Sequence, residues 1–351
     1  MKKTLVAVAA MAAVTGAMAQ ATIYGNIDQA LIKSRTTVAG VQTSSSTGMG
    51  SYQMGGSQIG FKGEEDLGSG LKASFLHEMG VTTEQDTSPG FQNAAAQTFT
   101  TRQAYVGLSG GFGALRIGKQ YSAAFINLIG SDPFGATGGS GAVYVGNLLI
   151  GNQGTGIDNP LRQDKAIRYD LPTLVPGVTI GATKVFAGAN SANGAPKTAD
   201  STGYAISYAS GPLNVGYTSD SIKAQNIAGA GVTAAATSTT KLTTFAAQYD
   251  FGMAKLTYSD GKIMNNGRGV KSSMTGIAIP MGAATLMLTS STGKASATAG
   301  DTKLKGMQYG ANYAMSKRTV AYFHANNSTS TTVANVATKT NGYGLGIHHS
   351  F

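Results

Sequence analysis

The sequence contains neither cysteine nor tryptophan, and only 12% of its 351 residues are charged. The charged share is about half of that in a typical soluble domain. Without cysteine, disulfides are excluded as the source of stability. Low charge together with only 8 prolines also argues against intrinsic disorder, which usually combines low hydrophobicity with high net charge. A membrane barrel fits this composition, because half of its strand residues face lipid.

Long hydrophobic runs are also missing. No segment reaches the 18 or so consecutive apolar residues of a transmembrane helix, so helical membrane spans are excluded. The N-terminus carries two lysines, an apolar stretch at 5–14 and a small-x-small site ending at Ala19. This is the pattern of a secretory signal peptide. We therefore expect 1–19 to be cleaved after Ala19 and 20–351 to form one domain.

The charges that are present have a positive balance. The formal net charge is +10, and about +8 would remain after removal of the signal peptide. An anion-favouring pore lining or contacts with lipid phosphates would account for this excess. No block of Lys and Arg and no basic helix occurs, which argues against nucleic-acid binding.

Alternation of apolar and polar residues recurs along the whole chain and predicts β-strands. In the hairpin predicted at 58–79, Ile59 and Phe61 share one face with other apolar residues. The opposite face carries Lys62 with Glu64 and Lys72 with Glu78. A membrane barrel turns the apolar face outward and a soluble sandwich turns it inward. Alternation alone does not separate these two folds.

The connections between strands do separate them. Roughly eight long polar connections alternate with about seven short turns, which implies about 16 antiparallel strands with all long loops on one side. The long connections lie near 36–55, 81–98, 121–163, 188–201, 221–240, 262–270, 292–302 and 327–340. The short turns lie near 65–70, 109–113, 171–177, 210–212, 251–253, 280–282 and 316–318. This asymmetry is typical of bacterial outer-membrane barrels, and strands of about 8–11 residues suit a tilted crossing.

The third long connection, at 121–163, has no strand or helix period over roughly 40 residues, and loops of that length are usually functional. The sequence therefore predicts an all-β fold, a 16-stranded antiparallel transmembrane β-barrel whose third long loop folds inward and narrows the channel.

Five segments form a set of motifs: GFKGEEDLGSGLKA at 60–73, RQAYVGL at 102–108, LRIGKQ at 115–120, IRYD at 167–170 and MSKRT at 315–319. Together they resemble motifs of general porins of the β-proteobacterial and neisserial type. The first is similar to that family's early hairpin, and the next two resemble the strand pair before its constriction loop. The resemblance implies a homotrimeric, water-filled outer-membrane channel. Because tryptophan is absent, the aromatic girdle of such a barrel must consist of Tyr and Phe.

The resemblance also concerns the last strand, which ends in Phe351. A C-terminal strand of this kind resembles the assembly signal that the outer-membrane insertion machinery reads. The expected partners are therefore that machinery, outer-membrane lipid and lipopolysaccharide, and two further copies of the chain.

Charged side chains that face the lumen are the candidate functional residues, because rings of charge set ion preference. Alternation places Lys62, Lys72, Arg116 and Arg168 on the inner face, together with Glu64 and Glu78. Arg116 and Arg168 flank the long loop and are the candidates for a basic wall of the constriction. Asp132 and Asp158, within the loop, are the candidates for the opposing acidic side.

Catalytic and metal motifs are lacking. No G-x-S-x-G, P-loop or H-E-x-x-H occurs, and the four histidines have no metal-ligand spacing, so no enzyme activity and no cofactor are expected. The predicted function is passive diffusion of small hydrophilic solutes and ions, with a mild anion preference. Two alternatives are open at this stage: an outer-membrane barrel that serves as an adhesin or enzyme scaffold, and a soluble exported β-sandwich.

Overall fold

The computed structural model describes residues 21–51, 53–81, 99–137, 161–186, 200–225, 237–265, 268–297 and 300–351. Most of these residues lie in antiparallel strands, and one short helix occurs among them, α2 (Ala123–Gly130). Within the same ranges, no helix has the length and hydropathy of a membrane span. The predicted signal peptide at 1–19 lies outside the described residues.

The strands are numbered along the chain. They are β1 (Thr22–Val38), β2 (Val41–Gly50), β3 (Gln58–Gly68), β4 (Leu71–Val81), β5 (Phe99–Gly110), β6 (Gly113–Tyr121), β7 (Arg162–Asp170), β8 (Val178–Val185), β9 (Asp200–Ser210), β10 (Leu213–Gln225), β11 (Thr237–Asp250), β12 (Lys255–Asn265), β13 (Arg268–Met281), β14 (Ala284–Ala297), β15 (Gly300–Ala314), β16 (Thr319–Thr331) and β17 (Ala337–Ser350).

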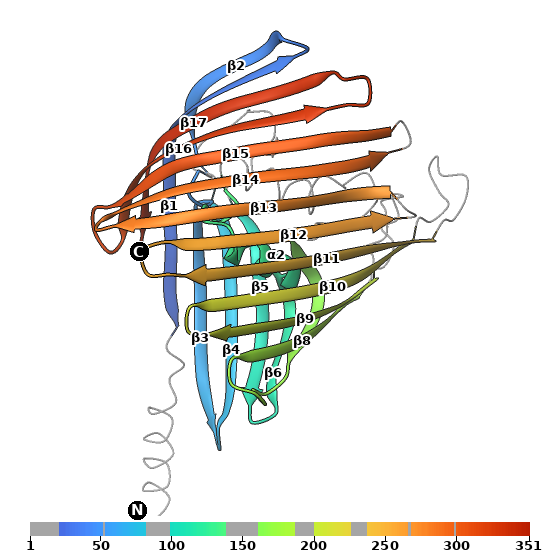
Figure 1. Ribbon diagram of the computed structural model, residues 1–351. Coiled ribbons are helices and arrows are strands. Elements are labelled where there is room, and N and C mark those ends of the chain that lie inside the picture. The colour runs from blue at the N-terminus through green and yellow to red at the C-terminus, as the bar shows by residue number, and fades with distance from the viewer. Residues whose placement is uncertain are drawn as a thin grey trace, which may run out of the picture.

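The strands form a closed ring (Figure 1). From β3 to β17, each strand pairs antiparallel with the next. β1 closes the ring, because it pairs with β17 on one side and with β3 on the other. Over the described residues, 16 strands therefore make up the barrel, as the sequence predicted. Among the described residues, closure pairs both edges of each of these 16 strands with a neighbour, which is what a sheet in lipid requires.

β2 is an additional strand and corrects one prediction. Residues 44–48 were expected in an exposed loop at 36–55, but β2 pairs with β1 from Val38 to Ala30 and extends the barrel wall beyond its rim. The Ser and Thr side chains of β2 are exposed, as predicted, yet the backbone of its edge facing β1 is paired. Polar Ser and Thr runs are compatible with a strand that lies in water on both faces, because Thr is β-branched and favours extended backbone.

The short turns lie where the sequence predicted them, but several long connections are shorter than predicted. Only 266–267 separate β12 from β13, and only 298–299 separate β14 from β15. The strands continue past the expected 8–11 residues, up to 17 in β1. In these extensions polar residues occupy both faces, so the loss of apolar alternation marked the end of the membrane layer and not the end of the strand.

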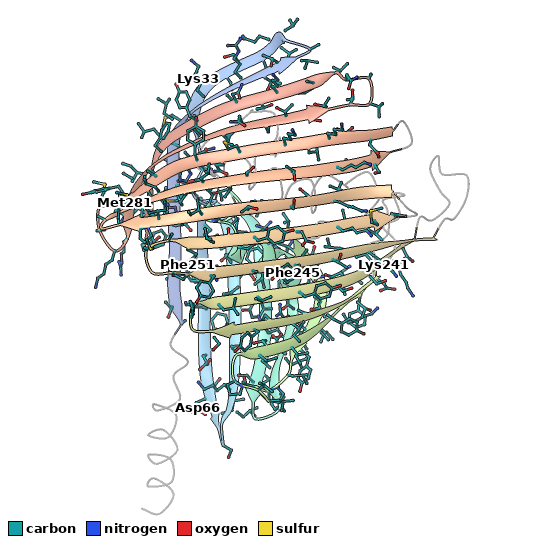
Figure 2. The ribbon with its side chains drawn as sticks, viewed as in Figure 1. Lys33, Asp66, Lys241, Phe245, Phe251 and Met281 are labelled. Atoms are coloured by element: carbon teal, nitrogen blue, oxygen red, sulfur yellow. The ribbon has the colours of Figure 1, made fainter. Side chains whose placement is uncertain are left out.

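The outer face of the barrel carries large apolar side chains that are exposed. Val106 is 61% exposed, Ile117 48% and Leu345 59%. Exposed Tyr and Phe provide the aromatic side chains on this face, in the absence of Trp. Figure 2 shows the order along β11, from Lys241 at the loop end through Phe245 to the turn at Phe251. An outer face with exposed apolar and aromatic side chains is what a lipid bilayer requires.

The inner face is not polar throughout. Inward-facing Ile222, Leu242, Ile263 and Met274 are buried, and they form one apolar cluster with Leu128 of α2. The alternation pattern had assigned apolar residues to the outer face alone. The exception follows from α2, because an apolar helix face that lies against the strands is stabilised by apolar partners there.

The chain terminus completes the ring. The N–H of Gly25 donates to the carbonyl of Phe351 at 3.2 Å, and the N–H of Phe351 donates to the carbonyl of Gly25 at 3.0 Å. The Phe351 ring lies against Gly25, where a Cβ would come within 2.5 Å of the ring. Glycine at position 25 therefore lets the last aromatic residue seal the seam between the first and last strands.

Candidate channel constriction

Residues 122–137 begin the segment that the sequence singled out. Ser122 caps α2, because its hydroxyl accepts from the N–H of Phe125 at 3.0 Å, which satisfies one free donor of the first turn. Beyond the helix, the carboxylate of Asp132 accepts from the N–H groups of Phe134 and Ala136 at 2.9 and 2.8 Å. The segment thus has an ordered local structure that the lack of periodicity did not predict.

This segment contacts inner-face residues of strands on several sides of the barrel. Asn127 donates to the carbonyl of Gly216 on β10 and to the hydroxyl of Thr244 on β11, at 3.2 and 3.0 Å. The side-chain amide of Gln308 on β15 donates to the carbonyl of Thr137 at 3.0 Å. These bonds attach residues 127–137 to the inner face of the barrel, opposite the face that carries the exposed apolar side chains.

A second segment, residues 53–57, lies against the same face. The buried carboxylate of Asp28 accepts from the N–H groups of Gln53 and Met54 and from the hydroxyl of Tyr322. His324 on β16 contacts the carbonyl of Gln53 at 2.8 Å, and its ring meets Phe134 edge-on. Part of the loop predicted at 36–55 is therefore bound to the inner face through Asp28.

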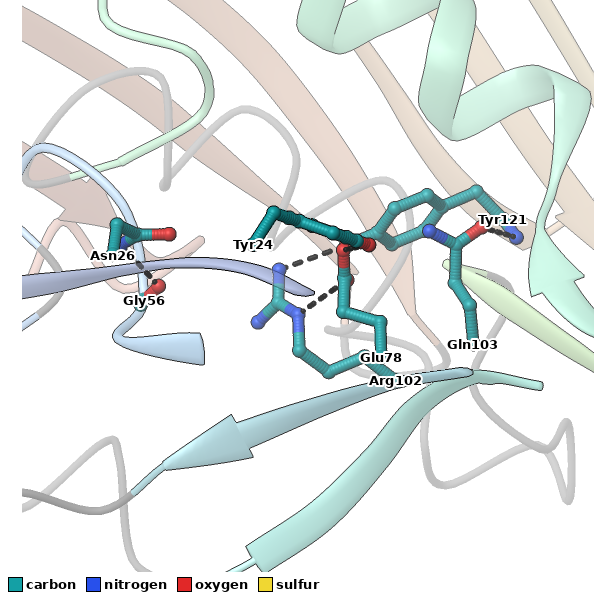
Figure 3. A network of polar contacts seen from close by, with 7 residues as sticks. All are labelled: Tyr24, Asn26, Gly56, Glu78, Arg102, Gln103 and Tyr121. Atoms are coloured by element: carbon teal, nitrogen blue, oxygen red, sulfur yellow. Dashed lines mark hydrogen bonds and ion pairs between the residues drawn. The ribbon is translucent and has the colours of Figure 1, made fainter. Parts of the chain in front are cut away.

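A cluster of polar and charged side chains surrounds Glu78 (Figure 3). Its carboxylate accepts from the guanidinium of Arg102 at 3.0 Å and from the hydroxyl of Tyr24 at 2.9 Å. Arg102 also donates to the hydroxyl of Tyr121 at 2.7 Å, at the point where β6 leads into α2. Both partners of the ion pair are largely buried, with 14% and 6% of their side chains exposed. The start of the long segment is thus bound to β1, β4 and β5 at once.

A β-bulge explains how Arg102 reaches this cluster. Val106 and Leu108 on β5 are exposed on the outer face, and strict alternation would put Arg102 on that face too. The register between β4 and β5 shifts, with Glu78 opposite Gln103 and Met79 opposite Thr101. An extra residue in one strand re-aims the side chains beyond it, and here it turns Arg102 inward.

A second guanidinium lies close to this cluster. Arg162, the first residue of β7, stacks over the ring of Tyr121 at 5.2 Å from its centroid. Beside it, Lys119 and Asp164 form an ion pair of 3.0 Å where the register of β6 and β7 shifts. Two guanidinium groups, those of Arg102 and Arg162, therefore lie close to the ring of Tyr121. The carboxylate of Glu78 is bound to Arg102.

Arg116 and Arg168 are brought together as expected, but at a different level. They are paired across β6 and β7, and both contact the carboxylate of Asp170. Asp170 is the last residue of β7, next to the short turn at 171–177. The pair lies roughly 15 Å along β6 from Tyr121, and Gly181 leaves the space for the Asp170 carboxylate.

The other predicted residues have separate positions. Lys62 lies over the ring of Tyr24 at 5.2 Å, and Lys72 forms an exposed ion pair of 2.6 Å with Glu64. Asp132 is buried, and burial raises the pKa of its carboxyl to about 6, against the opposing effect of its two N–H donors. Asp158 lies outside the described residues. The contribution of each residue to ion flow stays a prediction.

In the part of the chain that the structure describes, no group of three or more His, Asp and Glu side chains is arranged to hold a metal ion. The chain matches the family model of the Gram-negative porin over residues 7–333. It belongs to the Gram-negative porin family.

Relatives of this porin carry names of the same kind. Outer membrane porin protein 32 of Delftia acidovorans is 32% identical over 258 residues, which cover 73% of this chain and 68% of that relative. Major outer membrane protein P.IB of Neisseria meningitidis serogroup B is 42% identical over 121 residues, only 34% of either chain. The resemblance to porins of the β-proteobacterial and neisserial type is therefore confirmed.

A solved structure has the same fold. The anion-selective porin from Comamonas acidovorans matches with a TM-score of 0.76 at 24% identity, covering 95% of this chain and 100% of that one. The family and the closed barrel identify the porin as a channel for passive diffusion in the bacterial outer membrane.

Sequence reasoning missed several residues of the porin's inner wall. Arg102 was not proposed, because a bulge is not visible in the alternation pattern. Tyr24 was not proposed, because only charged side chains were taken as candidates, although alternation puts it on the inner face. Asp170 could have been found, since it stands two residues after Arg168 and residues i and i+2 share a strand face.

Proposed function

We propose that this channel passes small hydrophilic solutes and ions with a mild preference for anions. The observation that carries the preference is the charge balance at Tyr121. Arg102 donates to the hydroxyl of Tyr121 and Arg162 lies over its ring, while one carboxylate, that of Glu78, is paired with Arg102. An excess of fixed positive charge at a narrow point raises the local concentration of anions.

A bilayer conductance experiment under a salt gradient tests the preference. The wild-type protein is expected to give a reversal potential of the sign that anion flow produces. Arg162→Gln is expected to move that potential toward the cation side without abolishing stepwise conductance. Lys184→Gln, which removes the same charge from an exposed position on β8, is the matched control and should leave it unchanged. A wild-type potential of the cation sign would contradict the proposal.

The segment at 121–163 is the proposed constriction. Its first part, up to Thr137, is bound to inner-face residues of β10, β11 and β15. Residues 138–160 lie outside the described residues, so their path is a proposal. Shortening the segment within 138–160 should raise the conductance of each step, because it widens the narrowest section.

A homotrimer is the proposed assembly, as the resemblance to porins of this type implies. The outer face of β3 to β6 supports it. An apolar groove runs there between Phe75, Val106 and Ile117, and these side chains are exposed. Native mass spectrometry in mild detergent is expected to give three chains per particle.

We further propose that residues 1–19 serve as a leader cleaved after Ala19 and that 20–351 form the one domain. The last strand, ending at Phe351, is read by the insertion machinery. The activity is conduction and not catalysis. Sequencing the N-terminus of the mature protein tests the first of these.

A further inference from the structure

Lysines form a row on the outer face of four neighbouring strands near the loop end. Lys262 on β12 is paired with Lys271 on β13. Lys271 is paired with Lys294 on β14, and Lys294 with Lys303 on β15. We refer to these four residues as the lysine ladder. They occupy one continuous line across the sheet, perpendicular to the strands.

The ladder faces outward. Each of its lysines is exposed, while its neighbours along the strand, such as Ile263, Val270 and Ser272, are buried on the inner face. Alternation therefore puts the ladder on the same face as the exposed apolar residues Tyr258, Leu288 and Met307, which lie nearer the short turns. The ladder borders the apolar band on its loop side.

Like charges in this arrangement repel. Side chains directly opposite on antiparallel strands are separated by about 5 Å, and equal charges there are destabilising. Two acids lie close on this face. Asp301 forms a 2.5 Å ion pair with Lys294, and Asp260 stands two residues from Lys262. In the part of the chain that the structure describes, the other three ladder lysines make no ion pair, and Lys305 adds a further positive charge beside them.

A ligand with several negative charges would relieve this repulsion. At the border between the apolar band and the loop end, that ligand must also carry acyl chains that continue along the apolar surface. A phosphorylated lipid of the outer leaflet meets both conditions, because its phosphates lie at the headgroup level and its chains lie against the band.

We propose that the lysine ladder of β12 to β15 binds the phosphates of an acylated, phosphorylated lipid of the outer leaflet. The proposal rests on the outer-membrane location of the porin and adds a specific binding site to it. The lipid-binding site does not involve the channel, so the proposed lipid binding and the proposed conduction can fail independently.

The test uses the refolded, lipid-free porin in detergent without divalent cations, titrated with diphosphorylated lipid A. The ladder variant is Lys262→Gln, Lys271→Gln, Lys294→Gln and Lys303→Gln combined. The control variant changes four other lysines to Gln: Lys33, Lys184, Lys223 and Lys339. These are exposed or partly exposed strand residues that are not paired with one another. The net charge of the two variants is therefore equal.

The ladder variant is expected to bind lipid A at least tenfold more weakly than wild type, and the control variant less than threefold more weakly. Lipid A without its phosphates should bind wild type and ladder variant equally. Bilayer conductance should be the same for all three proteins. If wild type bound lipid A as expected but gave no stepwise conductance, the channel function would be contradicted and the lipid site would stand. Equal binding by wild type and ladder variant would overturn the proposal. So would an equal loss in the control variant, or a change in the number of chains per particle with lipid binding unchanged.

Discussion

Two walls of this barrel distribute their charges in opposite ways. On β3 to β7, a set of charged side chains faces inward and is joined in ion pairs, while the outer face bears large apolar residues such as Phe75, Val106 and Ile117. The inward set is Glu78, Arg102, Arg116, Arg168 and Asp170. On β12 to β15, the buried inner side chains that the structure describes are uncharged, and Lys262, Lys271, Lys294 and Lys303 lie outside.

The difference follows from what each wall contacts. The inner face of the second wall is covered in part by the segment 122–137, and neutral Thr, Ser and Gln side chains bind its backbone there. The inner face of the first wall carries the charged groups around which solutes would pass. Charge is thus found where water, ions or headgroups are available to solvate it, and not at one fixed face of the sheet.

The largest expected effect removes a charge from the inner wall of β3 to β7. Arg102→Leu leaves the carboxylate of Glu78, which is 6% exposed, without its cation. Breaking a buried ion pair by removing one partner costs about 3 kcal/mol or more. We expect a loss of this size in guanidinium unfolding of the barrel in lipid vesicles.

The double variant Glu78→Gln with Arg102→Leu is the control for that change. It should recover part of the lost stability, because no charge is then buried alone. A double variant less stable than Arg102→Leu alone would show that the ion pair is not the cause.

Adding a charge to the outer face of the same wall comes next in size. Val106→Lys puts a cation on the exposed apolar face of β5, which costs about 2 kcal/mol against hydrocarbon and is also unfavourable against an apolar face of a second copy. Ser74→Lys on the inner face of neighbouring β4 adds the same charge to the channel side and should change the unfolding free energy little. Equal losses in the two variants would remove the distinction between the faces.

A smaller effect concerns the covered inner wall and depends on pH. The pKa of Asp132 is raised to about 6 by burial, so its neutral form is favoured in the folded segment. The contribution of neutral Asp132 to the stability of this segment is therefore complete below about pH 4. It is lost as the pH rises through about 6, which lowers the free energy of unfolding of the segment by about 1–3 kcal/mol.

Hydrogen exchange of the amides at 123–137 measures this change. Their protection should fall between pH 4 and pH 7 after correction for intrinsic exchange rates, and Asp132→Asn should flatten the dependence. Amides of β14 serve as the internal reference. Protection that rises with pH would contradict the assignment.

The smallest effect is expected at an exposed ion pair. Lys72→Gln breaks the contact with Glu64, in which both side chains are about half exposed. Exposed pairs contribute little to stability. We expect no measurable change in unfolding and a slight shift of the reversal potential toward cations; a clear loss of stability would mean that this pair is shielded from water.

The sequence carried enough information for the barrel but not for its interior. Turn residues and the period of two located the short turns and the ring, because each strand had to present one face to lipid. The orientation of Arg102 depends on a bulge between β4 and β5, which adds one residue without a sequence signature. The buried Ile222 and Leu242 depend on α2, whose position is a tertiary contact that no local pattern encodes.

The central claim is that one face of each strand meets lipid and the other lines water. The porin has no cysteine, so single-cysteine variants report one position each. Lys72→Cys and Leu288→Cys, assembled in a bilayer, should be treated with a charged, water-soluble thiol reagent while conductance is recorded. Leu288 is an exposed apolar residue of β14, away from the face proposed for assembly. Lys72→Cys is expected to react with a fall in conductance, while Leu288→Cys is expected not to react. Rapid reaction at Leu288→Cys with none at Lys72→Cys would contradict the claim.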